Sequence, residues 1–249
     1  MKNILIYGSN SFIAKNFVIK YENYYNIYCY NKYFKNQKKF SSSLFKYIKR
    51  NKIKYLINFA ADNNNSKKNE NSKKILNSNF ILPVILLDLS EKLNVTIFLF
   101  LSAEVTKNNE IKNFYALSKK MLFEYVYSRK FSNKIRIINF DSVFGSFDKN
   151  FQRLIPSMMV NFIKAKKVNI NLNQKKKLIH VDVVNKKISN LLYSKKKLIY
   201  SKINGKLYNI YIVYKFIKKY LKNKKLKKNK YKNFISTYKW YLKYYGQAK

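Results

Sequence analysis

The chain has 249 residues, of which 53 are Lys or Arg and 11 are Asp or Glu, so its formal net charge is +42. This length suits one sizeable α/β domain with a small appendage, and a hydrophobic fraction of 47% excludes a disordered polyelectrolyte. The charge alone favours a nucleic-acid or membrane partner, but only four basic residues are Arg, and the Lys excess accompanies an excess of Asn, Ile, Tyr and Phe. We therefore attribute the charge to a bias towards A/T-rich codons.

The sequence pattern predicts strands that alternate with helices over the first 140 residues. Short apolar runs typical of buried parallel strands are followed by residues at helical spacing, although residues 32–43 are polar and irregular. This alternation predicts an α/β fold with a doubly wound parallel sheet. We place strands at 3–7, 26–30, 55–59, 96–101 and 135–140, and helices at about 8–18, 44–51, 73–92 and 115–129.

The pattern becomes less regular after residue 145. We place a domain boundary there, between residues 1–145 and 146–249. The tail over 214–245 is rich in Lys with apolar residues at helical spacing, and its charged face is typical of a solvated helix. Before this tail we expect helices at 153–166 and 181–193, an extended segment at 167–172 and a late strand at 206–210.

Single residues bound the chemistry further. The one cysteine, Cys29, excludes an internal disulfide framework and fits a reducing compartment. The one histidine, His180, disfavours a His-rich metal site and a Ser-His-Asp triad, so we expect no metal. No stretch approaches the ~20 apolar residues of a membrane span, and the apolar run before Gly8 is too short for a signal peptide. The sequence predicts a soluble, cytoplasmic protein.

A turn of small residues separates the first strand from the first helix. Gly8, Ser11 and Ala14 occur at regular spacing directly after the apolar run. Such a turn lets the backbone approach a pyrophosphate, which then lies at the helix N-terminus among unpaired N–H groups. Because only the first position is Gly, the turn taken alone is more often a tight structural turn.

A Ser, a Tyr and a Lys occur around the fourth strand and the helix after it. The strand ends at Ser102, and Tyr115 and Lys119 share one face of the following helix. A nearby ammonium lowers the pKa of a phenol from its usual value near ~10, which makes Tyr115 usable as a proton donor or acceptor. With 23 Tyr in the chain this spacing also arises by chance, but here it follows a strand that ends in Ser.

Segments spread over residues 3–190 follow, in order, the motifs of one known family. Residues 4–14 match a strand and a Gly-x-x-Gly-Phe-Ile-Gly turn, and residues 56–61 match a "VIHLAA" strand. The other matching positions are Asn79, 101–105, the Tyr115 and Lys119 pair, 138–145, Asp148 and 177–182. The chain therefore resembles the extended short-chain dehydrogenase/reductases, the NAD-dependent epimerase/dehydratase family that acts on nucleotide sugars.

The resemblance implies a Rossmann-type dinucleotide-binding domain over 1–145 and a substrate-binding region over 146–249, partly interleaved with the sheet. Segments 79–83, 141–145 and 153–156 look most like CDP-abequose and CDP-paratose synthases. They imply NAD(P)-dependent reduction of a 4-keto-deoxy nucleotide sugar, in surface-polysaccharide (O-antigen type) synthesis. A nucleotide-sugar 4-epimerase of the same family is one alternative, and a catalytically degenerate dehydrogenase-fold binding module is another.

The family's catalytic residues correspond to Ser102, Tyr115 and Lys119. The resemblance implies that Tyr115 protonates the sugar oxygen as hydride arrives at C4, that Ser102 hydrogen-bonds this oxygen, and that Lys119 holds the nicotinamide ribose. It places the substrate against Ser102, Glu104, Ser142 and Arg153. It places the cofactor against Gly8, Ser11, Phe12, Ile13, Asn31, Lys32, Ala60, Ala61, Asn79, Tyr115 and Lys119.

Departures from the family pattern refine these expectations. Ser11 and Ala14 replace two glycines but are small enough to keep the turn. Ala103 replaces the acidic residue of the 4,6-dehydratases, so elimination of water is not expected. Asn31, with Lys32 next to it, replaces the ribose-binding acid, which favours NADP over NAD. The segment after the second strand is short and lacks the family's usual third strand.

Two further expectations concern partners. His180 stands where the family often has Tyr, so we expect a wall residue of the substrate cleft rather than a ligand. Family members often dimerise through the helix that carries the Tyr and the Lys, so a homodimer is possible. We expect no specific nucleic-acid partner.

Overall fold

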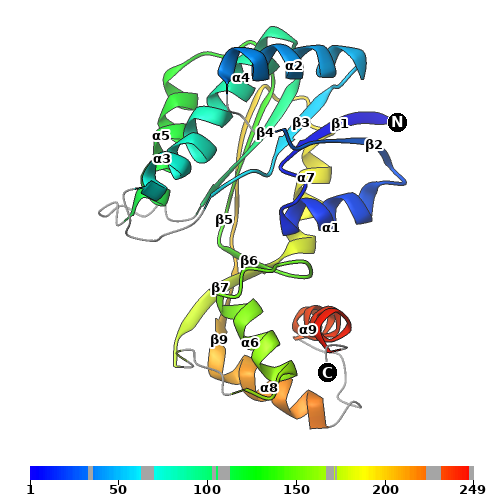
Figure 1. The fold of residues 1–249 in the computed structure, drawn as a ribbon, viewed down its shortest axis with the longest axis vertical. Helices are drawn as coiled ribbons and strands as arrows, with labels where there is room; N and C mark the ends of the chain where they lie inside the picture. The colour runs from blue at the N-terminus through cyan, green and yellow to red at the C-terminus, as the bar shows by residue number, and fades with distance from the viewer. Residues whose placement is uncertain are drawn as a thin grey trace. The chain divides into compact units, whose positions relative to one another are not determined.

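Six short apolar strands pair into one sheet, in the order β2-β1-β3-β4-β5-β8 (Figure 1). All neighbouring strands are parallel. Ile4, Ile57 and Phe98 in the middle of the sheet are fully buried, which explains why these strands are apolar on both faces. The expected α/β fold with a doubly wound, Rossmann-type parallel sheet is confirmed. The strands are β1 (Lys2–Tyr7), β2 (Tyr25–Tyr30), β3 (Tyr55–Asn58), β4 (Thr96–Ser102), β5 (Ile135–Phe140) and β8 (Leu198–Ile203).

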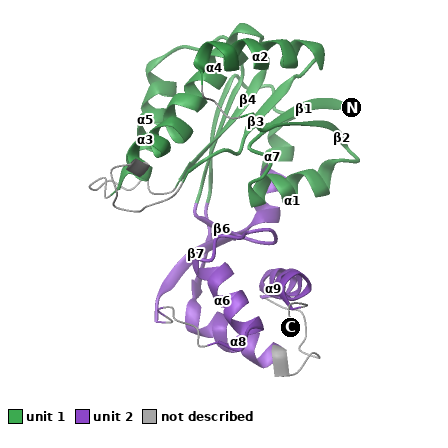
Figure 2. Cartoon of the chain, in the orientation of Figure 1, with its two compact units in different colours: residues 1–140, 188–203 green, residues 141–187, 204–249 purple. Residues whose placement is uncertain are grey.

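The chain divides into two compact units (Figure 2). The first unit holds Met1–Phe140 and Ile188–Ile203, and the second holds Asp141–Lys187 and Asn204–Lys249. The predicted division of cofactor and substrate binding between two regions of the chain stays a prediction. The structure is a computed structural model and describes residues 1–32, 36–62, 70–102, 105, 113–166, 171, 173–222 and 231–246.

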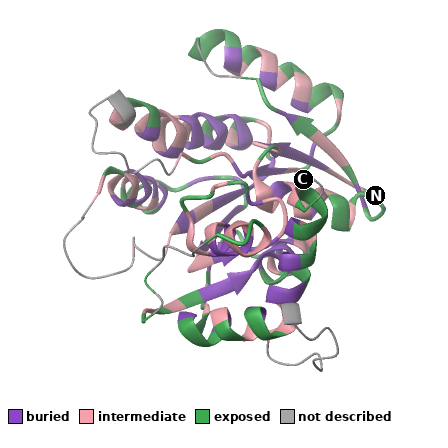
Figure 3. Ribbon diagram, turned by 60° about the horizontal axis from the view of Figure 1, so that its bottom comes forward, coloured by how far each residue is buried: buried purple, intermediate pink, exposed green. Residues whose placement is uncertain are grey.

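Helices cover both faces of the six-stranded sheet. Figure 1 shows α2, α4 and α5 on one face and α1 on the other. Leu44 of α2, Leu86 of α4 and Leu122 of α5 belong to one buried cluster with Leu5 and Leu99 of the sheet. Figure 3 shows the same pattern, since buried residues run along the strands while exposed residues line the outer sides of helices. The helices are α1 (Phe12–Tyr21), α2 (Gln37–Arg50), α3 (Glu70–Leu76), α4 (Leu82–Lys92) and α5 (Phe114–Ser128).

The helix predicted over 73–92 contains a π-helical turn. This turn, η1 (Asn77–Ile81), joins α3 to α4 without a break. A π-helical turn holds one more residue than an α-helical turn, so it changes the direction in which the side chains point. Asn79, in the middle of η1, is 0% exposed.

The second unit contains a three-stranded sheet in the order β6-β7-β9, in which β7 is parallel to β6 and antiparallel to β9. Its core is aromatic, and the rings of Phe144 and Phe234 stack with centroids 4.4 Å apart. Met158 and Tyr241 belong to the same buried cluster. The elements are β6 (Ser142–Phe144), β7 (Lys175–His180), β9 (Lys206–Asn209), α6 (Leu154–Ile163), α7 (Val181–Leu191, continuing into the first unit), α8 (Ile210–Lys222) and α9 (Lys232–Tyr245).

The structure differs from the predicted elements in several places. Strands β6, β7 and β8 are additional to those predicted from the pattern. Helix α2 begins at Gln37, within a stretch predicted to be irregular. The sequence pattern does not show this start, because Phe40 is the only residue of the helix that is buried before Leu44. Within the described residues the sheet ends at β2, as expected from the missing third strand. The extended segment predicted at 167–172 lies outside the described residues except for Asn171.

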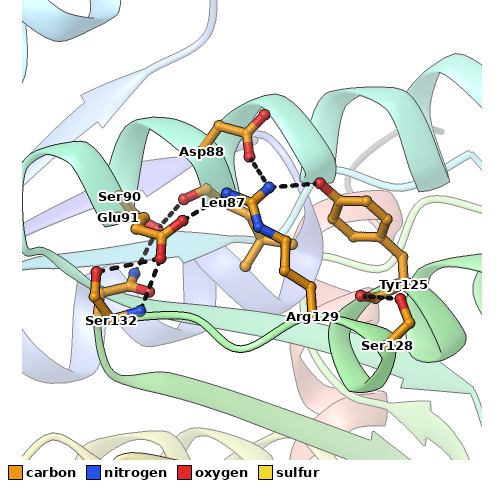
Figure 4. A network of polar contacts seen from close by, with 9 residues as sticks. Leu87, Asp88, Ser90, Glu91, Tyr125, Ser128, Arg129 and Ser132 are labelled. Carbon is orange, nitrogen blue, oxygen red and sulfur yellow. Dashed lines mark hydrogen bonds and ion pairs between the residues drawn. The ribbon is translucent and has the colours of Figure 1, made fainter.

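A network of polar contacts joins the C-terminal ends of α4 and α5 (Figure 4). Arg129 Nη1 donates to Asp88 Oδ1 at 2.9 Å and to Tyr125 Oη at 3.0 Å, and Arg129 Nη2 donates to Glu91 Oε2 at 2.8 Å. The Ser132 N–H donates to Glu91 Oε1 at 2.7 Å and, with Arg129, lowers the pKa of Glu91. These contacts hold α5 against α4.

Candidate active site

The turn between β1 and α1 depends on a glycine with positive φ. Gly8 has φ +78°, and a Cβ at this position would lie 2.6 Å from Ala60 N and 2.8 Å from Ala60 Cα. The Ser11 N–H donates to Gly8 O at 3.1 Å, and the Ser11 hydroxyl accepts the Ala14 N–H at 3.2 Å, which caps α1. The bare Gly8 backbone, followed directly by the positive N-terminal end of α1, fits a pyrophosphate group. The predicted cofactor residues in this turn of α1 are Phe12 and Ile13, both half-buried.

Asn31, just after β2, is bonded to the same turn. Asn31 Oδ1 accepts the Ser9 N–H at 3.0 Å, and Asn31 Nδ2 donates to Ser9 Oγ at 2.6 Å. The exposed Lys32 follows, and its carbonyl accepts a hydrogen bond from Tyr7 Oη at 2.8 Å. The amide of Asn31 and the ammonium of Lys32 therefore stand where the family pattern has a ribose-binding acid.

The end of β3 packs against this turn. The Ala60 N–H donates to Oδ1 of the buried Asn58 at 3.1 Å, and Ala61 is exposed. The small side chain of Ala60 leaves the space into which the Gly8 backbone fits. The structure thus brings Gly8, Asn31 and Ala60 together at the carboxyl ends of three neighbouring strands, which is where ligands bind in sheets of this kind.

Ser102 ends β4, and Tyr115 and Lys119 lie one turn apart in α5. The Asn113 side chain accepts an N–H of the first turn at 2.8 Å, so the helix begins immediately before Tyr115. Lys119 Nζ donates to Phe100 O at 3.0 Å, which connects α5 to the end of β4. Burial lowers the pKa of Lys119 to about 8, because a charged ammonium is disfavoured away from water. Ser102 and Tyr115 are half-buried.

The side-chain amide of Asn79 forms hydrogen bonds to Asp62 and Ser118, all within the first unit. Asn79 Oδ1 accepts the Asp62 N–H at 3.0 Å, and Asn79 Nδ2 donates to Asp62 O at 2.8 Å and to Ser118 Oγ at 3.2 Å. Ser118 Oγ donates in turn to Tyr115 O at 2.8 Å. These bonds use both N–H groups and the oxygen of the Asn79 amide. The predicted contact of Asn79 with a cofactor stays a prediction.

Two predicted substrate residues belong to the second unit. Ser142 begins β6 and is half-buried. Arg153 Nη1 pairs with Asp148 Oδ2 at 2.8 Å, and Asp148 is 3% exposed. Burial raises the pKa of Asp148, and the charge of Arg153 acts in the opposite direction. Tyr241 Oη donates to the carbonyl of Asp148, so a buried set of contacts holds Arg153 at the start of α6.

The remaining predictions concern Glu104 and His180. Glu104 lies outside the described residues, as does the neighbouring Ala103. His180 is 8% exposed, packs edge-on against Phe144 and lies with Nδ1 3.5 Å from Asp182 Oδ2. Within the described ranges, no three His, Cys, Asp or Glu residues cluster closely enough to hold a metal ion. None of the helices described is long and apolar enough to span a membrane.

Several residues that connect the predicted ones were not predicted. Ser9 bonds to Asn31, Asp62 bonds to Asn79, and Ser118 bonds to Tyr115. Asn113 caps the helix that carries Tyr115. Signals for two such residues were present: Ser118 lies inside the Tyr-Ala-Leu-Ser-Lys segment, and Asn113 is a residue type that favours the N-cap. Ser9 and Asp62 are joined to their partners only by the fold.

Residues 4–196 match the model of the NAD dependent epimerase/dehydratase family. The chain belongs to this family. The match covers more than half of the chain and includes the turn at Gly8 together with Ser102, Tyr115 and Lys119. No curated protein sequence matches the chain.

Solved structures with the epimerase/dehydratase fold resemble the whole chain. A UDP-N-acetylglucosamine 4-epimerase from Methanobrevibacter ruminantium M1 gives a TM-score of 0.81 at 14% identity, covering 98% of this chain and 99% of that one. A UDP-glucuronic acid 4-epimerase from Bacillus cereus gives 0.80 at 14% identity, covering 99% of each chain. A dTDP-4-dehydrorhamnose reductase from Bacillus anthracis str. Ames gives 0.74 at 17% identity, covering 89% of this chain and 82% of that one. At these identities the likeness establishes the fold.

Proposed function

We propose that this chain reduces the carbonyl of a 4-keto-deoxy nucleotide sugar with a nicotinamide dinucleotide. The observation that carries the proposal is the placement of Ser102 at the end of β4 and of Tyr115 and Lys119 in α5, with Lys119 buried and bonded to Phe100 O at 3.0 Å. The similar solved structures include nucleotide-sugar epimerases and a 4-keto-sugar reductase, which supports this class of substrate.

The dinucleotide would be held by the turn after β1 and by the strand ends beside it. When bound, it supplies hydride to C4 of the sugar. The Gly8 backbone and the first turn of α1 receive the pyrophosphate, and Lys119 holds the nicotinamide ribose. The other proposed contacts are Ser11, Phe12, Ile13, Asn31, Lys32, Ala60, Ala61, Asn79 and Tyr115.

Tyr115 supplies the proton that completes the reduction. Its phenol donates a proton to the sugar oxygen as the carbonyl carbon is reduced, and water returns a proton to the phenolate. Ser102 donates a hydrogen bond to the same oxygen and stabilises its developing negative charge. The ammonium of Lys119, one helical turn from Tyr115, favours the phenolate and so lowers the barrier to proton transfer. In the second unit, Ser142 and Arg153 are the proposed substrate contacts.

We propose NADPH rather than NADH as the reductant. A carboxylate at position 31 would bind the ribose hydroxyls of NAD, whereas here the Asn31 amide bonds to Ser9 and the exposed Lys32 follows. The cation attracts the 2′-phosphate of NADPH. Replacement Asn31→Asp is therefore expected to raise the KM for NADPH and to lower that for NADH, measured with both cofactors at saturating sugar.

The reaction is tested with a panel of nucleotide 4-keto sugars assayed separately with NADPH and NADH. Loss of absorbance of the reduced cofactor, mole for mole with the sugar consumed, is the expected result. The 4-epimerase alternative predicts interconversion of two sugars without net change in the cofactor, and that result would overturn the reductase proposal.

Replacement Tyr115→Phe tests the role of the phenol. We expect turnover to fall by about 10²–10⁴-fold, because the proton donor is lost, while the affinity for the dinucleotide is kept. Tyr127→Phe, at an exposed position of the same helix, is the matched control and should retain full turnover. Full turnover in Tyr115→Phe would refute the assignment.

A further inference from the structure

A buried chain of hydrogen bonds connects the segment after β3 to the first turn of α5. It runs from the backbone of Asp62 through the amide of Asn79 to Ser118 Oγ, and from there to the carbonyl of Tyr115. Asn79 and Ser118 are both 0% exposed, so water does not reach these groups. Removal of either side chain would leave a buried polar partner unpaired.

The position of Asn79 in the π-helical turn explains why its amide contacts both Asp62 and Ser118. This turn falls between α3 and α4, and its additional residue directs the Asn79 amide to Asp62 and Ser118 at once. Both N–H groups and the oxygen of this amide are used. The amide of Asn79 thus sets the position of Ser118 relative to the end of β3.

We propose that Ser118 is a positioning residue for Tyr115, and that Asn79 acts on Tyr115 through it. The inference rests on the proposed function, in which the Tyr115 phenol gives up the proton. Tyr115 lies in the first turn of α5, three residues before Ser118. The bond from Ser118 Oγ to Tyr115 O ties this turn, through Asn79, to the backbone of Asp62. Asp62 follows Ala60, which packs against Gly8, by two residues. Tyr115 is then held at a set position relative to both the cofactor turn and Lys119.

Ser90 provides a matched control because it repeats this arrangement elsewhere. Ser90 Oγ donates to Leu87 O, three residues back, at 2.8 Å, and it accepts a hydrogen bond from Asn133 Nδ2 at 2.8 Å. Ser90 is also 0% exposed. Ser90→Ala and Ser118→Ala therefore remove the same set of buried bonds, one from α4 and one from the helix that carries Tyr115.

The kinetic test compares the two variants in the full chain. For Ser118→Ala we expect kcat to fall by about tenfold or more with an unchanged KM for the dinucleotide, because a small displacement of the reacting group lowers the rate steeply. Asn79→Asp keeps the shape but loses the bonds donated to Ser118 Oγ and Asp62 O, so its kcat should also fall. Ser90→Ala should lose comparable thermal stability but keep kcat. An equal fall of kcat in both Ser→Ala variants, or none in Ser118→Ala, would overturn the proposal.

A second measurement does not depend on the reaction. NMR of protein labelled at the Tyr ring carbon Cζ follows the titration of each phenol, and the Tyr115 signal is the one missing from Tyr115→Phe. We expect the apparent pKa of Tyr115 to be higher in Ser118→Ala than in the wild type and unchanged in Ser90→Ala. An unchanged Tyr115 titration in Ser118→Ala would overturn the positioning role. Failure of the wild type to reduce any sugar, with the expected titrations, would instead refute the proposed function alone.

Discussion

The ammonium of Lys119 lies in surroundings that disfavour its charge. The side chain is 4% exposed, and its Nζ donates to Phe100 O at 3.0 Å. Burial lowers its pKa from 10.5 to about 8, so the group is mainly charged at neutral pH and mainly neutral above about pH 8. An ammonium whose pKa lies so close to neutral pH is typical of functional sites. Keeping it charged while buried lowers the stability of the fold.

The pH dependence of that cost can be measured against Lys119→Met. Between about pH 8 and pH 10.5 the unfolded chain holds a proton on Lys119 that the folded chain has released, so the stability of the wild type rises with pH in this window. Relative to the variant, the wild type should gain up to about 3 kcal/mol between about pH 7 and pH 10. Urea unfolding of both proteins at both pH values gives the difference, from which the many Tyr titrations cancel. A difference that does not change with pH would contradict the prediction.

Single residues were predicted from the sequence where a local pattern marked them. Gly8 stands at the end of an apolar run, and Tyr115 and Lys119 share one face of a helix that follows a strand ending in Ser, so the local pattern marks these positions. The contact of Asn79 with Ser118 was not predicted, since it joins residues 39 apart in the chain. A hydrogen bond of that kind depends on the π-helical turn and on how helices pack, neither of which the residue pattern specifies.

Helix α5 depends on its N-cap for the placement of Tyr115. The Asn113 side chain accepts the Ala116 N–H at 2.8 Å, and this bond closes the turn that contains Tyr115. Asn113→Ala should cost about 1 kcal/mol of stability and also lower kcat, because the first turn then frays. Asn36→Ala removes the equivalent cap of α2, where Asn36 Oδ1 accepts the Lys39 N–H at 3.0 Å. We expect a similar loss of stability there with kcat unchanged, measured by urea unfolding and steady-state kinetics. Equal kcat in the two variants would argue against a role for the cap.

The elements missed in prediction owe their form to their neighbours. Strand β7 begins with three Lys residues and buries only Leu178, Ile179 and His180, so its first half carries no strand signal of its own. It forms because β6 and β9 pair with it on either side. Five of the six strands of the larger sheet were predicted, and its central strands are mostly apolar because they are buried on both faces. Strand β8, at the edge of this sheet, buries only Ser201 and was not predicted. Tertiary pairing, rather than local propensity, decides the others.

The charge of the whole molecule leaves most cations without a carboxylate partner, since 53 basic residues face 11 acidic ones. Among the described side chains, the carboxylates of Asp88, Glu91 and Asp148 are already paired with Arg. Repulsion among the remaining Lys residues opposes the folded state, in which they are closest together. We predict that the main effect of this charge is to destabilise the fold by self-repulsion, and that it does not serve a polyanion partner.

Added salt should therefore stabilise the protein. Between about 10 mM and about 100 mM NaCl the Debye length falls from ~30 Å to ~10 Å, which screens repulsion between surface Lys residues, so the thermal midpoint should rise. Replacement of the exposed Lys38, Lys39 and Lys46 on α2 by Glu lowers the net charge and should raise the midpoint in low salt while reducing its dependence on salt. A midpoint that is unchanged or lower in added salt would show that self-repulsion does not limit stability.

Duplex DNA binding, titrated over the same salt range, should be weak and lost with salt, whereas nanomolar binding at physiological salt would favour a nucleic-acid role.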